Sequence, residues 1–332
     1  MRRIAALTFL TLVAASAAFS GELAVGLLLP TQQEERWVRD FHVFRTKAEE
    51  YGCRLEVGVV RNNQEMQNER ALQLLDKDID VLIIAPHDAE GAAPAVVAAR
   101  SVGVPIVCYD RLVLGIQTDA YVSFDNVRVG ELQGEWLRDR GPRGNYVVMS
   151  GAPTDANSKM LLDGVMGVLQ PMADAGEIEI VARQPVIDWQ PANAMKIVET
   201  VLAKLNGDIS AVVAPNDATA SAAITALEAM GLAGKVAVTG QDADVRAVRR
   251  ILEGTQSMTV FKDTRLLGDL ALQVALRLAR AEDVSEDTDR TVDCGEGEVP
   301  AFLLEPVAVD KANAMEVLVE SGYMKREDII GD

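Results

Sequence analysis

The chain has 332 residues, of which 49% are hydrophobic and 25% are charged, and this is the composition of a soluble globular protein with about two domains. Its formal net charge of −18 argues against binding to nucleic acid or to an anionic membrane, because both require basic patches. The charge instead favours a neutral or cationic partner.

The N-terminus has the features of a secretory signal. Arg2 and Arg3 precede a short apolar run over residues 4–15, and Ala18 and Ser20 have the spacing that a signal peptidase prefers. The apolar run is too short to span a bilayer. We therefore expect residues 1–20 to be a cleaved signal peptide and the mature chain to be exported and soluble.

Three cysteines are too few for a disulfide framework. Cys108 lies in an apolar, strand-like segment and is most simply a small core side chain. A bridge from Cys53 to either Cys108 or Cys294 stays open at this point.

Strand-like and helix-like segments alternate along most of the chain. The strand-like segments are residues 23–30, 54–60, 81–86, 104–110, 120–125, 145–151, 178–186, 209–217 and 236–242. Strands separated by helices indicate βαβ units and a parallel sheet. Because the pattern restarts near residues 125–130, we predict an α/β fold with two doubly wound, flavodoxin-like lobes. The acidic stretch 281–300 is expected to be a surface excursion before a further strand.

Motifs for catalysis and for metal binding are missing from the sequence. It has no G-x-G-x-x-G, no phosphate-binding loop and no G-x-S-x-G. His42 and His87 are its only histidines, and no histidine or cysteine cluster has metal-ligand spacing. We therefore expect no cofactor, no metal and no enzymatic activity, although an exported enzyme acting on sugars stays an alternative.

Polar and aromatic side chains recur just beyond the strand-like segments, where doubly wound sheets bind their ligands. They are Arg36, Trp37, His87, Asp110, Arg111, Asn157, Trp189, Asn216, Asp242 and Lys262. Carboxylate and amide oxygens beside Arg and Lys donors suit sugar hydroxyls, which both donate and accept. An indole packs on the apolar face of a pyranose, whereas Asp110 and Asp242 would repel a phosphate. These residues predict a site for a neutral sugar.

Each of these side chains also has a purely structural interpretation. Asn216 and Asp242 would both serve as helix N-caps. Trp37 and Trp189 would be ordinary core aromatics, and His87 alone would be a structural residue. The prediction therefore depends on the repeated placement at strand ends.

Several longer stretches carry a resemblance to a known family. They are "ERW", "CYDR", "SFDNVRVGELQ", "NDATASAAITAL", "GLAGKVAVTGQDAD" and "GTQSMTVFK", and the similarity covers the chain after the signal peptide. They resemble the D-xylose-binding members of the type I periplasmic sugar-binding proteins, which serve ABC transporters. The resemblance implies an N-terminal lobe over residues 21–126 and 260–304 and a C-terminal lobe over 127–259 and 305–332. It also implies a three-segment hinge near residues 125–127, 257–260 and 303–306.

The resemblance further implies that a monomeric protein closes on a monosaccharide, with D-xylose favoured, and delivers it to the membrane permease subunits of an ABC transporter. The sugar contacts that it implies are Arg36, Asp110, Arg111, Asn157, Trp189, Asn216, Asp242 and Lys262. The chain departs from the family pattern at "PTQQE", which replaces an acidic segment, and at His87-Asp88, which replaces Tyr-Asn. Two alternatives stay open: a sensor that signals to a chemoreceptor or a histidine kinase, and another sugar such as ribose or glucose.

Overall fold

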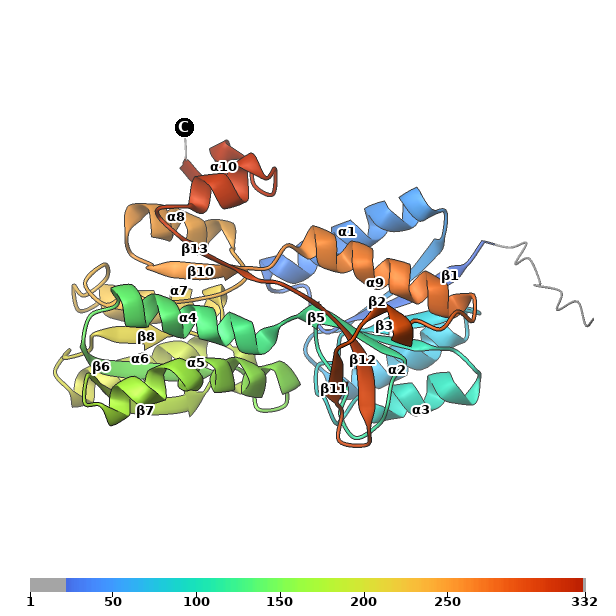
Figure 1. The fold of residues 1–332 in the computed structure, drawn as a ribbon, viewed down its shortest axis with the longest axis horizontal. Helices are drawn as coiled ribbons and strands as arrows, with labels where there is room; N and C mark the ends of the chain where they lie inside the picture. The colour runs from blue at the N-terminus through green and yellow to red at the C-terminus, as the bar shows by residue number, and fades with distance from the viewer. Residues whose placement is uncertain (1–21, 331–332) are drawn as a thin grey trace, which may run out of the picture.

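The computed structural model describes residues 22–330, so the expected signal peptide at residues 1–20 lies outside the described residues. The described chain forms two α/β lobes that lie side by side along the long axis of the molecule (Figure 1). Within residues 22–330, no helix is both long enough and apolar enough to cross a membrane.

The first lobe contains a seven-stranded sheet in the order β11-β12-β5-β4-β3-β1-β2. Its strands are β1 (Ala24–Leu29), β2 (Arg54–Val59), β3 (Val81–Ile84), β4 (Ile106–Tyr109), β5 (Ala120–Phe124), β11 (Thr291–Asp293) and β12 (Glu298–Leu304). All neighbouring strands are parallel except β11 and β12, which form an antiparallel hairpin. The order β2-β1-β3-β4-β5 confirms the predicted flavodoxin-like winding. The hairpin occupies much of the stretch that was expected to be only a surface excursion.

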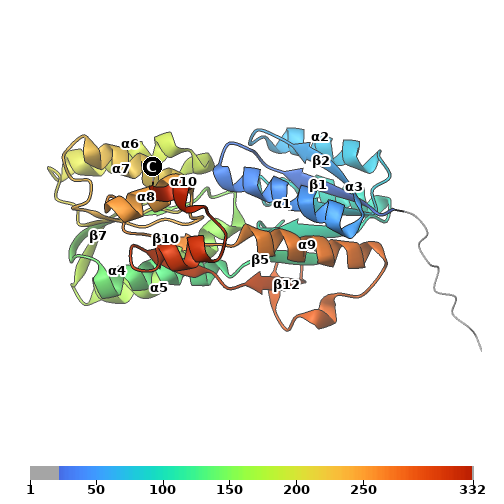
Figure 2. The ribbon, with the colours of Figure 1, turned by 90° about the horizontal axis from the view of Figure 1, so that it is seen from above.

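Helices cover both faces of this first sheet. Helices α1 (Glu35–Tyr51) and α9 (Thr264–Ala279) lie side by side on one face (Figure 2), and α2 (Gln64–Leu75) and α3 (Ala93–Ser101) pack on the other. Helix α1 buries Trp37, Phe44 and Ala48 along one stripe, as expected of an amphipathic helix on a sheet. The first turn of α1 lies near the carboxyl end of β4, since Trp37 and Asp110 line the same hollow.

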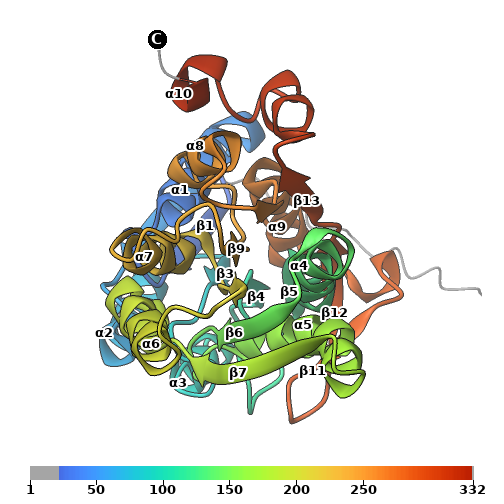
Figure 3. The same ribbon diagram turned by 90° about the vertical axis from the view of Figure 1, so that its left-hand side faces the viewer.

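The second lobe repeats the design around a four-stranded parallel sheet in the order β7-β6-β8-β9. These strands are β6 (Gly144–Ser150), β7 (Ile178–Pro185), β8 (Ala211–Val213) and β9 (Ala237–Val238), followed by the antiparallel pair β10 (Met258–Phe261) and β13 (Val307–Asp310). Helices α4 (Asn126–Arg140) and α5 (Ala156–Asp174) lie on one side of the sheet, and α6 (Pro191–Lys204) and α7 (Asp217–Glu228) lie on the other (Figure 3). Helices α8 (Val245–Glu253) and α10 (Arg326–Ile330) pack with β10 and β13.

The chain passes between the lobes three times. The crossings lie at Asp125, between β5 and α4, at residues 262–263, between β10 and α9, and at residues 305–306, between β12 and β13. The resemblance predicts the second crossing at residues 257–260 and a returning segment of the first lobe that begins at residue 260. The structure instead keeps all of β10 in the second lobe, because Met258 to Phe261 pair with β13.

The three cysteines are all buried and free. Cys108 lies in β4 and Cys294 directly follows β11, and both belong to the core on the α2 and α3 face. Cys53 lies in the core on the α1 and α9 face. The structure therefore contains neither of the two bridges that the sequence left open.

Helices α4 and α5 approach so closely that glycine is required where they cross. A Cβ on Gly164 would overlap the carbonyl oxygen of Val127, and a Cβ on Gly130 would overlap that of Leu161. Gly167 lies one turn further along α5 and has open space around it. Helix α4 begins directly after the first crossing. Its close contact with α5 therefore also holds the start of the second lobe in place next to that crossing.

We expect Gly164→Ala to lower the free energy of unfolding by about 2–3 kcal/mol, because the added methyl must push two helix backbones apart. Gly167→Ala is the matched control, and alanine should raise the free energy of unfolding by about 0.5–1 kcal/mol at that exposed helical position. Chemical denaturation of the two variants measures both values. Equal effects of the two substitutions would contradict the close contact.

Candidate functional site

A buried chamber lies between the lobes at the carboxyl ends of the strands. Its lining residues, which define the chamber below, are Glu34, Arg36, Trp37, Asp110, Arg111, Asn126, Asp155, Asn157, Leu161, Trp189, Asn216, Gln241, Asp242 and Lys262. The interior leaves about 40 Å³ for the centres of water molecules. Because both lobes supply walls and most lining side chains are buried, the structure is a closed conformation.

Nine of the ten residues predicted for the site line this one chamber. They are Arg36, Trp37, Asp110, Arg111, Asn157, Trp189, Asn216, Asp242 and Lys262. His87 is not among the lining residues; it follows β3, is half-buried, and its backbone N–H donates to Gln67 Oε1 at 2.9 Å. A role of these residues in ligand binding remains a prediction.

The structural interpretations of single residues are compatible with this placement. Asn216 does cap α7, since its side chain accepts from the backbone N–H of Thr219 at 2.9 Å. The cap of α8 is Asp244 rather than Asp242. Trp37 is only 2% exposed and joins the core of the first lobe while its ring also faces the chamber.

Five lining residues were missed by the sequence analysis: Glu34, Asn126, Asp155, Leu161 and Gln241. Glu34 lies two residues before Arg36, and Gln241 directly precedes Asp242. A wider window at each strand end would therefore have included both. Leu161 is one helical turn after Asn157, which places both on the same face of α5. Asp155 is the N-cap of α5, and this common role hid its contact with the other lobe.

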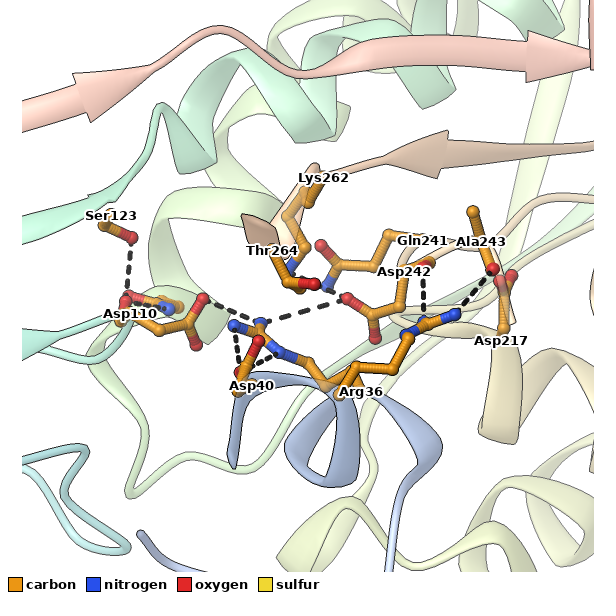
Figure 4. Close-up of polar contacts among 12 residues, drawn as sticks. Arg36, Asp40, Asp110, Ser123, Asp217, Gln241, Asp242, Ala243, Lys262 and Thr264 are labelled. Atoms are coloured by element: carbon orange, nitrogen blue, oxygen red, sulfur yellow. Dashed lines mark hydrogen bonds and ion pairs between the residues drawn. The ribbon is translucent and has the colours of Figure 1, made fainter. Parts of the chain in front are cut away.

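The guanidinium of Arg36 lies among three carboxylates (Figure 4). Its Nη1 donates to Asp110 Oδ1 at 2.7 Å, and its Nε and Nη2 donate to Asp40 Oδ2, both at 3.2 Å. Asp242 of the second lobe approaches Nη1 at 4.0 Å. Arg36 and Asp40 are one turn apart on α1, so this pair is set by the helix itself.

Burial and charge oppose each other in the acids around Arg36. Burial would raise the pKa of Asp110, but Arg36, with Lys262 and Arg111, outweighs that effect and holds the pKa below its ordinary value. For Asp40, which is fully buried, burial dominates over Arg36 and raises the pKa to about 6. Asp110 is therefore the strongly ionised partner of Arg36 at neutral pH.

A second guanidinium, that of Arg111, joins the lobes. Its Nε lies 2.9 Å from Asp155 Oδ2 of the second lobe, and Trp189 Nε1 donates to the same oxygen at 3.1 Å. The Arg111 guanidinium lies 5.3 Å from the ring centre of Trp37 and 6.0 Å from that of Trp189. The chamber thus has two indole rings from opposite lobes with a cation between them.

Three of the lining residues have left-handed backbone conformations that side chains other than glycine rarely adopt. The φ angle is 60° at Asp110, 56° at Trp189 and 97° at Asp242. The Asp110 carbonyl accepts three hydrogen bonds, from Tyr121 Oη at 3.0 Å, Ser123 Oγ at 2.8 Å and Asn157 Nδ2 at 2.8 Å. Such strain persists only where the surroundings fix it, and it concentrates at functional sites.

Outside the chamber, Arg39 of α1 forms another bridge between the lobes. Its Nη2 donates to the Asp242 carbonyl at 3.1 Å and lies 3.4 Å from Asp244 Oδ1. Glu35 contributes from the same turn, because its Oε1 accepts from the Val245 N–H at 3.5 Å. None of Arg39, Glu35 and Asp244 lines the chamber. These contacts therefore stabilise the closed form without lining the chamber.

Comparisons with known proteins agree with this architecture. The family model described as "Periplasmic binding protein domain" matches residues 25–283. The D-xylose-binding periplasmic protein of Escherichia coli (strain K12) is 40% identical over 313 residues, which are 94% of this chain and 94% of the relative. The protein with the same name in Haemophilus influenzae (strain ATCC 51907 / DSM 11121 / KW20 / Rd) is 40% identical over 325 residues, 96% of this chain and 97% of the relative.

A solved structure has the same fold across both lobes. The carbohydrate transporter solute binding protein from Chloroflexus aurantiacus, in complex with D-glucose, matches with a TM-score of 0.87 at 32% identity. The match covers 94% of this chain and 99% of that chain. With the family model, the curated relatives and the fold in agreement, this chain belongs to the periplasmic binding protein family.

Proposed function

We propose that this protein captures a monosaccharide between its lobes, with D-xylose preferred, and delivers it to the membrane permease of an ABC-type transporter. The observation that carries the proposal is the buried chamber, in which carboxylates and amides alternate with guanidinium and ammonium groups beside two indole rings. The names of the two relatives at 40% identity support xylose, and the glucose complex of the structural neighbour supports a monosaccharide.

The chemistry of the lining supports a neutral polyol. Three cations, Arg36, Arg111 and Lys262, face four carboxyl groups, so a ligand with a formal charge would meet repulsion from one set. Among residues 22–330, Glu34 Oε2 and Gln241 Oε1 are buried without a hydrogen-bond donor, whereas Asp242 Oδ1 lies 2.9 Å from Lys262 Nζ. Each of these oxygens can accept from a sugar hydroxyl, while the guanidinium and ammonium groups donate to it.

Capture follows from closure of the two lobes. A sugar held by one lobe gains its remaining contacts only in the closed form, so binding shifts the open–closed equilibrium toward closure. A permease can then distinguish loaded from empty protein by shape. We infer that this occurs in the periplasm and that the sugar is bound without being converted.

The direct test is titration calorimetry of sugar-free protein with D-xylose, D-ribose, L-arabinose, D-glucose and D-galactose. We expect one sugar per chain, the highest affinity for D-xylose, and unchanged D-xylose after long incubation. Tighter binding of another sugar would overturn the preference for xylose, and conversion of xylose would overturn binding without catalysis.

Asp110→Asn should weaken D-xylose binding by about 10- to 100-fold, because the neutral amide leaves the buried guanidinium of Arg36 undercompensated. Asparagine tolerates the left-handed backbone at this position better than alanine does, so the fold should persist. Asp78→Asn is the matched control, since Asp78 is exposed and also has a positive φ of 51°. Calorimetry that gives equal affinities for the two variants would show that the ion pair of Asp110 with Arg36 does not support sugar binding.

Arg39→Ala should weaken the binding of every sugar by about the same factor, roughly fivefold, because it removes a bridge worth about 1 kcal/mol that is present only in the closed form. The preference among sugars should stay unchanged, since Arg39 does not line the chamber. Arg45→Ala, an exposed position on the same helix, is the control. A changed order of preference in calorimetry, or an unchanged affinity, would contradict the bridging role.

A further inference from the structure

A second hollow lies next to the chamber, and the two share a single wall residue. This outer groove is lined by the start of α1 and by residues of α6, α7 and α8, including Gln33, Glu34, Met195, Ala222 and Arg246. It leaves about 750 Å³ for the centres of water molecules, against about 40 Å³ in the chamber. Helices α6 and α7, which supply part of its lining, lie on the side of the molecule away from β12 and β13 (Figure 3).

Glu34 is the residue that lines both hollows. It occupies the N-cap position of α1, yet its side chain makes no capping hydrogen bond. Its Oε2 is buried and has no hydrogen-bond donor within residues 22–330. Burial raises the pKa of Glu34, although Arg111 acts in the opposite direction. A carboxyl group in this state gains from a neutral hydroxyl that donates to it.

The wall at Glu34 differs from the walls at Trp37 and Asp110 in what lies behind it. Asp155 also borders an open hollow, but Arg111 Nε and Trp189 Nε1 both contact its Oδ2, whereas Glu34 Oε2 has no donor in the described part of the chain. Trp37 and Asp110 are backed by the first lobe, and both are less than 4% exposed. Behind Glu34 lies the open volume of the outer groove. Shortening the Glu34 side chain would therefore connect the chamber to a space that can hold a larger group. Shortening a residue that packs on the core of a lobe would leave only a closed cavity.

We propose that Glu34 is a specificity-determining residue, which accepts a sugar hydroxyl through Oε2 and, by its length, limits the size of the sugar that the closed chamber admits. This inference rests on the proposed function. It assigns to the segment before α1 a role in selecting against sugars that carry an extra hydroxymethyl group or a second ring. A wall that excludes such a group is worth about 10- to 200-fold in discrimination.

The test compares Glu34→Ala, Glu34→Gln and the control Gln32→Ala, an exposed position that lines neither hollow. Calorimetry measures the affinities for D-xylose, D-glucose and xylobiose, and thermal melting checks that each variant is folded. Glu34→Ala should bind D-xylose about tenfold more weakly, and its preference for D-xylose over at least one larger sugar should fall by about tenfold or more. Glu34→Gln keeps the wall and an acceptor oxygen, so its preference should stay within about threefold of the wild type.

The outcomes separate this inference from the proposed function. If the wild-type protein binds none of the three sugars, both the proposed function and the inference fail. If it binds sugar but Glu34→Ala matches Gln32→Ala in affinity and in both ratios, the inference alone fails. Equal losses of preference in Glu34→Ala and Glu34→Gln would also overturn it, because side-chain length would then not be the cause.

Discussion

The buried charge of Arg36 is the constraint on which the site depends. A guanidinium that is 6% exposed is tolerated only where carboxylates compensate it and its donors are satisfied. Asp40 and Asp110 of the same lobe provide this compensation by direct hydrogen bonds, whereas Asp242 of the second lobe lies at 4.0 Å. The first lobe therefore holds an assembled charge cluster, and closure adds the last carboxylate.

Asp40 shows the energetic cost of that arrangement. Burial raises its pKa to about 6 even though Arg36 donates two hydrogen bonds to it. Both hydrogen bonds from Arg36 reach Oδ2, so the two oxygens of the carboxylate are unequally compensated. In return, Asp40 holds the Arg36 side chain in its position before any ligand binds. A site fixed in advance loses less entropy on binding.

The strand-end rule predicted much of the site because it is a local property of the chain. Asp110 follows β4 and Asn216 follows β8, and in a doubly wound sheet such positions meet at one edge. Asp155 was missed because its importance comes from Arg111, which lies in the other lobe at a distance that no sequence spacing encodes. The second crossing was misplaced for a similar reason, since β10 stays in the second lobe by pairing with β13 almost fifty residues later. Local sequence patterns thus predict helices and strands and where they end. They do not predict contacts that depend on how the two lobes pack together.

The adjacent residues Asp110 and Arg111 show how the two lobes are joined through one strand end. They do not pair with each other: Asp110 binds Arg36 within its lobe, and Arg111 binds Asp155 across the chamber. The left-handed φ of 60° at Asp110 accompanies this divergence, and three hydrogen bonds to its carbonyl hold the turn. One of these bonds comes from Asn157 of the second lobe, so closure itself helps to fix the strained residue. A ligand that stabilises the closed form therefore also stabilises the backbone that aims the Asp110 carboxylate at it, and binding and preorganisation reinforce each other.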